Sequence, residues 1–324
     1  MKKFFAILLT LLLVVSLTAA TADGVDINII ALKGPTSMGM VQFMDQVDQG
    51  IITDNQYSFS IVGAIDEVSP KLVQGSMDIA ALPANLASVL YNNTNKEIMV
   101  LAVNTLGVIY IVQTGDIVTS VESLRGQIIY ASGKGATPEY ALNYILRGNG
   151  IDPETDVTIE WKSEHAECLA ALMANDNGIA MLPQPFVATG QMKDERITIA
   201  LDMTKEWDAL QTQSDAPSAM ITGVVVARKA FVQEHPEAVA AFMQHYAASV
   251  EFVNANMDEA AALIGAYGIV PEAVARKALP TCNIVFIAGE DMKTKLSGYL
   301  EALFAQNPKA VGGALPDDDF YYNK

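Results

Sequence analysis

The sequence is poor in cysteine, histidine and positive charge. Its 324 residues include two cysteines, three histidines, and 20 lysines and arginines against 37 aspartates and glutamates. The resulting net charge of −17 disfavours nucleic acid and anionic membrane surfaces as partners, because both repel a negative protein. The charge of a small ligand stays open, since a local site can oppose the sign of the whole protein.

With so few cysteines and histidines, the sequence has few candidate residues for a metal site or a catalytic site. Cys168 and Cys282 lie far apart in apolar stretches, so two buried free thiols are expected, with a disulfide as the alternative. His165, His235 and His245 form no HExxH or other metal-ligand spacing, and no G-x-S-x-G motif occurs. We therefore expect no metal and no cofactor. His165 and Cys168 are the only candidates for acid–base or nucleophilic chemistry.

A long apolar run occurs at the N-terminus. Lys2 and Lys3 precede the apolar residues 4–17, and Ala-Thr-Ala at 20–22 forms an A-x-A cleavage site. This pattern predicts a signal peptide cleaved near Ala22, because the run is too short for a spanning helix. Cleavage would remove both lysines and change the net charge from −17 to −19. With no cysteine near the site, we expect an exported protein, periplasmic or at the cell surface, without a lipid anchor.

Strand and helix patterns alternate along the rest of the chain. Apolar strands are expected at 26–32, 57–64, 77–82 and 98–103, with amphipathic helices between them. The same order recurs about 100 residues later, and Ile-Ala-Ala-Leu-Pro at 79–83 matches Ile-Ala-Met-Leu-Pro at 179–183 in four of five residues. This repetition predicts two similar α/β lobes with largely parallel sheets.

Two further strands, at 107–113 and 220–227, fall outside the repeat. A chain that leaves the first lobe and returns to it needs two such crossovers. We therefore expect the first lobe to hold residues 23–112 plus 223–324, and the second lobe 113–222. The pattern after 231 is helical and should pack on the first lobe. The final non-periodic tail, with aspartates at 317–319, predicts a solvated turn clamped by the aromatic residues 320–322 rather than a Ca²⁺ site.

Four strand-to-helix junctions share one design, a short turn rich in glycine, proline and small polar residues. They lie at 33–37, 82–85, 132–138 and 182–186. Glycine lets the backbone approach a ligand, and the N–H groups of a first helical turn point at it. Because ligands of open α/β sheets bind beyond the carboxyl ends of the strands, these junctions and Asn104 should face one cleft. The alternative is that proline at a helix start is ordinary loop chemistry.

The sequence indicates little about the charge of the expected ligand. The arginines of the mature chain all lie outside the junctions, at positions 125, 147, 196, 228 and 276. A strongly ionised ligand usually recruits a bidentate arginine, which argues against dicarboxylates and phosphate esters. Lys33 and Lys134 could balance one negative charge or point to solvent. The 132–138 loop lacks the Walker A spacing and the third glycine of G-x-G-x-x-G, so a nucleotide is not expected.

Three stretches resemble a known family. They are Gly-Ser-Met-Asp-Ile-Ala-Ala-Leu-Pro at 75–83, Ala-Thr-Pro-Glu-Tyr-Ala-Leu at 136–142 and Ile-Ala-Met-Leu-Pro-Gln-Pro-Phe at 179–186. They are similar to the solute-binding proteins of ABC importers for nitrate, sulfonates, taurine and thiamine-precursor pyrimidines, over about residues 25–304. The resemblance implies a type II periplasmic-binding-protein-like α/β fold whose two lobes close about two crossover strands. It also implies ligand contacts at Gly34, Thr36, Ser37, Leu82, Asn85, Ser132, Gly135, Thr137, Gln184 and Thr222.

The function implied by this resemblance is that of a monomeric carrier. It would capture a small polar or anionic organic solute by hinge closure and deliver it to a membrane permease with its ATPase. Gram-positive members commonly carry a lipobox cysteine, which is missing here. Two other hypotheses stay open: an enzyme of the pyrimidine-precursor type on the same scaffold, and an exported sensor domain.

Overall fold

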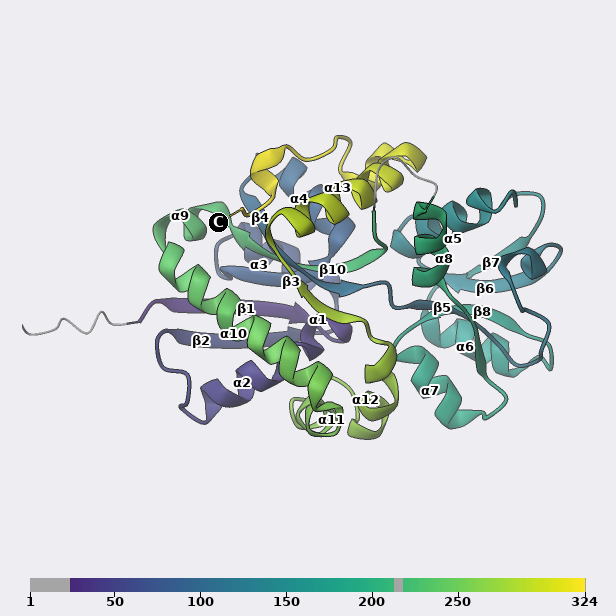
Figure 1. Ribbon diagram of the computed structural model, residues 1–324, viewed down its shortest axis with the longest axis horizontal. Helices are drawn as coiled ribbons and strands as arrows, with labels where there is room; N and C mark the ends of the chain where they lie inside the picture. The colour runs from purple at the N-terminus through teal and green to yellow at the C-terminus, as the bar shows by residue number, and fades with distance from the viewer. Residues whose placement is uncertain (1–23, 213–217, 324) are drawn as a thin grey trace, which may run out of the picture.

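The computed structural model describes residues 24–212 and 218–323. Figure 1 shows two α/β lobes side by side, each with a central sheet and covering helices. We call them lobe 1, with a six-stranded sheet, and lobe 2, with a five-stranded sheet. The predicted signal peptide and its cleavage site near Ala22 lie outside the described residues.

Lobe 1 is built from both ends of the described chain. Its strands are β1 (Asp26–Leu32), β2 (Gln56–Val62), β3 (Ile79–Pro83), β4 (Ile98–Leu106), β10 (Ile221–Arg228) and β11 (Ile284–Ile287). Its helices are α1 (Pro35–Met38), α2 (Val41–Asp48), α3 (Val68–Val73), α4 (Ala84–Asn93), α9 (Lys229–Glu234), α10 (Pro236–Ala255), α11 (Met257–Ala266), α12 (Glu272–Ala278) and α13 (Gly289–Gln306).

Lobe 2 is built from the middle of the chain. Its strands are β5 (Ile109–Gln113), β6 (Ile128–Ser132), β7 (Thr158–Lys162), β8 (Ile179–Pro183) and β9 (Thr198–Asp202). Its helices are α5 (Thr137–Gly148), α6 (His165–Met173), α7 (Phe186–Lys193) and α8 (Met203–Gln211). Short 3₁₀ turns also occur in the described chain, at Ile65–Glu67, Val121–Leu124, Leu279–Thr281, Pro308–Val311 and Asp318–Phe320.

The two sheets share one strand order. Lobe 1 reads β2-β1-β3-β10-β4-β11, and lobe 2 reads β7-β6-β8-β5-β9. In each sheet the first three strands are parallel and the fourth is antiparallel to its neighbours. The antiparallel strands are β5 and β10, which the chain forms just after it passes from one lobe to the other. The prediction of two similar α/β lobes is therefore confirmed.

The repeated pentapeptide occupies the same place in both lobes. Strand β3 pairs with β10 so that Pro83 faces Gly223, and β8 pairs with β5 so that Pro183 faces Ile109. In both strands the first four residues are buried and the proline is half-buried. A central strand covered on both faces needs a continuous apolar run, and both segments have one.

The sheets place the crossings slightly differently from the expected boundaries. The expected division after residue 112 falls inside β5, whose five residues pair with β8 and β9 of lobe 2. The chain therefore passes into lobe 2 between Leu106 and Ile109. It has returned by Ile221, which pairs with Leu106 in the sheet of lobe 1.

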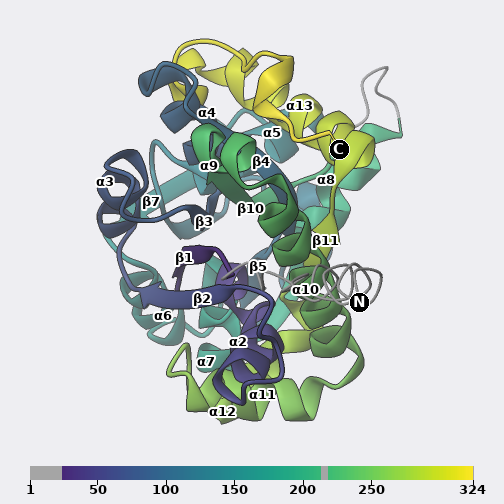
Figure 2. The same ribbon diagram turned by 90° about the vertical axis from the view of Figure 1, so that its left-hand side faces the viewer.

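The helices after residue 228 cover both faces of the lobe 1 sheet, as expected for this block. Helix α10 packs on α2 and α11, while α13 packs on β4 and α4 (Figures 1 and 2). Two of these helices also reach lobe 2, because α12 contacts α7 and α13 contacts α5. One hydrophobic core on the α13 side runs through both lobes and includes Trp207 and Tyr299.

The C-terminal tail is held on lobe 1 by its buried aromatic side chains, as expected, while its three aspartates are exposed. Asp317, Asp318 and Asp319 each meet a lysine from a different part of the lobe: Lys96, Lys293 and Lys229 respectively. The carboxylates thus diverge, and in the described residues no group of three His, Cys, Asp or Glu side chains could hold a metal ion. The following Phe320 is completely buried.

Both cysteines are buried free thiols, as expected. Burial raises the pKa of Cys282 to about 12 and also raises the pKa of Cys168. Among the helices of residues 24–212 and 218–323, none is both long and apolar enough to cross a membrane.

Candidate functional site

Hydrogen bonds between side chains and loops join the two lobes at the ends of their parallel strands. Thr137, which begins α5, donates from Oγ1 to Oδ1 of Asn85, which follows β3, at 3.0 Å. Gln184, directly after β8, donates from Nε2 to Oγ1 of Thr281 at 2.6 Å. The hydroxyl of Tyr110 donates to the carbonyl of the same Thr281 at 2.7 Å. The carboxyl ends of β3, β6 and β8 therefore face each other across the junction of the lobes.

The lobe 1 side of this junction is a small polar cluster. Asn104, completely buried near the end of β4, donates from Nδ2 to the carbonyl of Thr36 at 3.0 Å and accepts from Thr105 at 3.1 Å. Gly223 of β10 lies against Asn104 and Thr36 and leaves no room for a side chain. A Cβ there would lie 2.5 Å from Asn104 Oδ1 and 2.7 Å from Thr36 Cγ2. Only glycine therefore fits where β10 passes this cluster without displacing it.

A buried tyrosine lies beneath the same cluster. The hydroxyl of Tyr246, on α10, lies beside Asn104 without a hydrogen bond of standard geometry to any described residue. Burial raises the pKa of Tyr246, and Asn104 partly offsets this rise. Tyr246 therefore keeps its proton, and its hydroxyl is an unused hydrogen-bond donor next to the Asn104 cluster.

The lobe 2 side contains a serine–histidine pair. Ser132 Oγ, at the end of β6, lies 2.6 Å from Nδ1 of His165, the first residue of α6. Burial lowers the pKa of His165, so the imidazole is neutral at pH 7. The contact allows two arrangements: Ser132 donates to Nδ1 and the ring proton is on Nε2, or Nδ1–H donates to Ser132 and the hydroxyl proton is free. In both, the pair has one proton left to donate, and Nε2 has no hydrogen-bond partner within the described chain. The ring of Phe186 lies 5.1 Å from that of His165.

The glycine-rich turn shapes the start of α5. Gly133 and Gly135 have φ values of +82° and +78°, in the left-handed region that glycine tolerates. Helix α5 begins at Thr137, as predicted, and in the described structure its first N–H makes no hydrogen bond. The N–H of Gly135 is turned away, because it donates to Oε2 of Glu139 at 2.6 Å. The start of α5 therefore offers the Thr137 N–H as its available backbone donor.

The other predicted contact residues differ in what they offer. Leu82 is completely buried and belongs to the hydrophobic core. Ser37 is buried and donates to the carbonyl of Gly34 at 3.1 Å. Thr222 donates to the carbonyl of Leu106 at 2.5 Å, where the chain leaves lobe 1. The predicted set of ligand contacts stays a prediction.

Sequence reasoning did not assign three residues to this junction, namely Tyr110, Thr281 and Tyr246. It considered His165 near the cleft but did not pair it with Ser132. Tyr110 belongs to the crossover strand and Thr281 to a turn after α12, far from any junction motif. The internal repeat could not indicate His165, because Ile65 stands at the equivalent position of lobe 1. Lys134 is exposed and lines a separate cavity on the outer side of α5, with Arg147 and Trp161.

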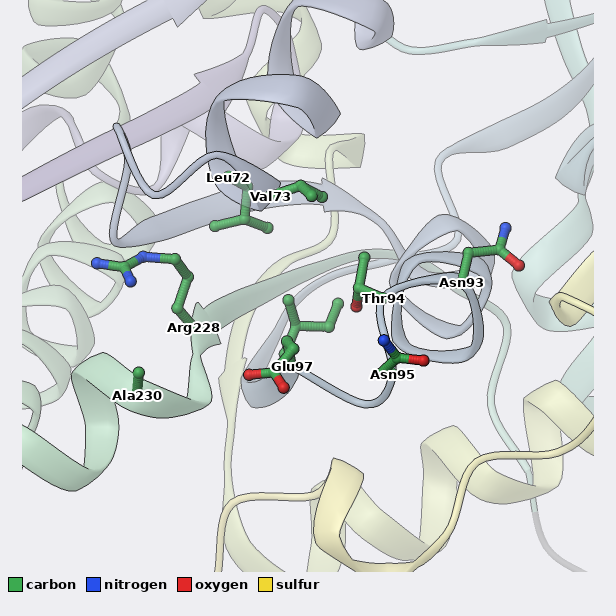
Figure 3. Close-up of a pocket in the computed structure, with 9 residues that line it drawn as sticks. Leu72, Val73, Asn93, Thr94, Asn95, Glu97, Arg228 and Ala230 are labelled. Atoms are coloured by element: carbon green, nitrogen blue, oxygen red, sulfur yellow. The ribbon is translucent and has the colours of Figure 1, made fainter.

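A distinct cavity of about 370 Å³ lies at the opposite end of the lobe 1 strands (Figure 3). It is lined by residues that include Leu72, Glu97 and Arg228, where β4 begins and β10 ends. The Arg228 guanidinium is already bound to Asp78 at 2.6 Å and to the carbonyl of Met77 at 3.1 Å. This cavity lies away from the strand ends that join the lobes, so it is not part of the candidate site.

Two lobes with matching sheets, facing strand ends and a polar junction between them define a two-lobed binding protein. The sequence model of the family described as "ABC transporter, phosphonate, periplasmic substrate-binding protein" matches residues 42–272. The chain belongs to this family, whose members are exported substrate-binding proteins. A search of curated proteins gives no match.

Solved structures of the same fold include several binding proteins. An ABC transporter protein from Parabacteroides distasonis is 24% identical, with a TM-score of 0.76, over 93% of this chain and 100% of that one. The periplasmic aliphatic sulphonate binding protein SsuA from Escherichia coli is 16% identical, with a TM-score of 0.70, over 89% and 90%. The alkanesulfonate-binding protein SsuA from Xanthomonas axonopodis, solved with MOPS, is 14% identical, with a TM-score of 0.63, over 93% and 97%. These likenesses confirm the two-lobed periplasmic-binding-protein fold.

Proposed function

We propose that this protein captures a small organic oxyanion between its lobes and delivers it to the membrane permease of an ABC importer. The carrier acts as a monomer after export, and the permease works with its own ATPase. The family to which the chain belongs is named for phosphonate, and two of the similar structures are sulfonate-binding proteins. Phosphonates and sulfonates share a tetrahedral head group with several acceptor oxygens.

The observation that carries the proposal is the set of donors at the end of β6. The Thr137 N–H and the one free proton of the Ser132–His165 pair, on Ser132 Oγ or on His165 Nε2, belong to one end of lobe 2. Helices α5 and α6 both begin there, and the N-terminus of a helix favours negative charge. These groups are donors suited to an oxyanion, and none needs to lose a proton to bind it.

The lobe 1 side supports closure over the bound head group. Asn85 already reaches across to Thr137, and Asn104 and Tyr246 supply further polar groups behind it. A solute that contacts both lobes would favour the closed arrangement, because those contacts exist only when the lobes meet. Binding and closure are therefore coupled.

The proposal is tested by titrating the mature protein with methylphosphonate, methanesulfonate, sulfate and nitrate in a calorimeter. Loss of the Ser132 hydroxyl in Ser132→Ala should weaken binding of the preferred anion by roughly 10- to 150-fold, the range for hydrogen bonds to charged groups. Ser163→Ala is the matched control, since Ser163 is exposed two residues before His165. Small-angle scattering should show a smaller radius of gyration with the bound anion. Absence of binding by all four anions overturns the proposal.

The enzyme hypothesis has one observation in its favour, the short contact between Ser132 and His165. A nucleophile–base pair also needs a third group that orients the base. Burial alone accounts for the lowered pKa of His165, and no carboxylate contributes to it. The Cys168 thiol has a raised pKa, which opposes nucleophilic thiolate formation. These observations favour a binding site over a catalytic one.

A further inference from the structure

A second hollow lies in lobe 2, between α6 and α7. It measures about 390 Å³ and is mainly apolar. The two helices contribute one face each, with the i, i+3, i+4, i+7 spacing of a helical stripe. The lining residues are Ala166, Leu169, Ala170, Met173, Phe186, Thr189 and Lys193. We call this hollow the α6–α7 groove.

The groove lies next to the proposed oxyanion site, with Phe186 between them. Helix α6 starts at His165 and α7 starts at Phe186, so both helices run from the junction of the lobes toward the far side of lobe 2. Phe186 lines the groove and its ring also lies 5.1 Å from His165. One aromatic side chain therefore borders both places.

The walls of the groove are fixed by the core beneath them. Leu169 is only 4% exposed, and Met173 and Phe186 pack against the same buried cluster of lobe 2. Ala166 and Ala170 are exposed and keep the groove open, because their side chains are small. The shape is thus set by packing and does not depend on a ligand.

The far end of the groove is charged, whereas the rest of it is mainly apolar. Lys193, the last residue of α7, is the one charged side chain among the lining residues. It is exposed and makes no ion pair within the described chain. Helix α7 has eight residues, so the groove runs for roughly 12 Å at about 1.5 Å per residue.

We propose that the α6–α7 groove is a second subsite, which binds the apolar arm of a solute whose oxyanion head lies at Ser132 and His165. This inference rests on the proposed function and adds to it the class of solute. The solute is an organic oxyanion with an alkyl or aryl arm several carbons long. An acidic group at the end of the arm adds affinity through Lys193.

Chain-length dependence tests the groove directly. Methyl-, butyl- and octylphosphonate are titrated against the wild-type protein in a calorimeter. Affinity should rise by roughly two- to fourfold for each methylene that enters the groove, where fourfold corresponds to about 0.8 kcal/mol for a fully buried CH₂. The variant Ala170→Leu fills the groove from an exposed helix position with a good helix former. It should bind methylphosphonate like the wild type and lose at least tenfold in affinity for octylphosphonate.

The matched control is Ala209→Leu, an equally exposed alanine on α8, which does not line the groove. It should bind all three compounds like the wild type. Equal affinity across the series, or an octyl preference that survives Ala170→Leu, overturns the groove inference and leaves the proposed function standing. Absence of binding by the whole series, with sulfonates also failing, overturns both.

Discussion

The hydroxyl of Thr137 in lobe 2 donates a hydrogen bond to the Asn85 side chain of lobe 1, across 3.0 Å. Asn85 is itself held in place, since its Nδ2 donates to the carbonyl of Ala310 in the C-terminal turn at 3.3 Å. One amide side chain thus connects α4, α5 and the C-terminal segment. The Thr137 contact is one of those that separation of the lobes must break.

The Thr137–Asn85 contact should contribute measurable coupling between the lobes. Thr137→Val and Asn85→Ala each remove one partner, and the double variant completes a cycle. Denaturant unfolding should give a coupling of about 0.5–1.5 kcal/mol, the usual net value of such a hydrogen bond. Strict additivity of the two single changes would mean that the contact does not hold the lobes together.

Substitution of Gly223 should disturb the lobe 1 cluster. In Gly223→Ala the new Cβ meets Asn104 and Thr36 at less than 3 Å, so one of them must move. We expect a loss of about 1–3 kcal/mol in the free energy of unfolding, as for other overpacked sites. Gly63→Ala is the control, because a Cβ there meets no atom within 4 Å. Equal stability of the two variants in urea unfolding would contradict the prediction.

The two tryptophans should differ sharply in their effect on stability. Trp207 is completely buried between Tyr144, at a ring distance of 4.0 Å, and Tyr299, at 5.5 Å. Trp207→Ala should cost about 3–5 kcal/mol, the range for large buried aromatics. Trp161, half-exposed on the edge strand β7, should cost much less in Trp161→Ala. The comparison is made by urea unfolding followed by circular dichroism.

His165 should make stability depend on pH in the weakly acidic range. Its folded-state pKa lies below the ordinary value of 6.5, because burial penalises the charged form. The unfolded chain therefore binds more protons below that value, so the free energy of unfolding falls as pH drops through 6.5. His165→Gln should reduce the difference in stability between pH 7.5 and 5.5. His235→Gln, remote from the junction, serves as the control, and an equal effect of both changes would contradict the assignment.

The fold could be predicted in large part because its signals are local and repeated. Apolar runs such as 79–83 and 179–183 need burial on both faces, and the structure places both at equivalent strands. The short strand β11 was not predicted, because its four residues join β4 only at the edge of the sheet. Helix α8 was also missed: it follows β9 without a loop, starting at the N-cap Asp202.

The candidate site was less predictable from the sequence, because the residues that hydrogen-bond to one another there are far apart in the chain. The junction motifs marked Ser132, Thr137 and Asn85, and the structure brings these residues to the same region. No motif marks Thr281, which joins the junction only because α12 packs against α7. Likewise, the turn of the Gly135 N–H toward Glu139 depends on a side chain outside the glycine-rich run.

The hydrophobic core on the α13 side, which passes through both lobes, also bears on how the molecule denatures. Its members come from all three segments of the chain, before the first crossing, between the crossings and after the second. Neither lobe can bury this surface alone, so the lobes should unfold in a single cooperative transition despite their separate sheets. The hinge motion that we propose and unfolding are then distinct events, because the shared core keeps the two lobes one thermodynamic unit.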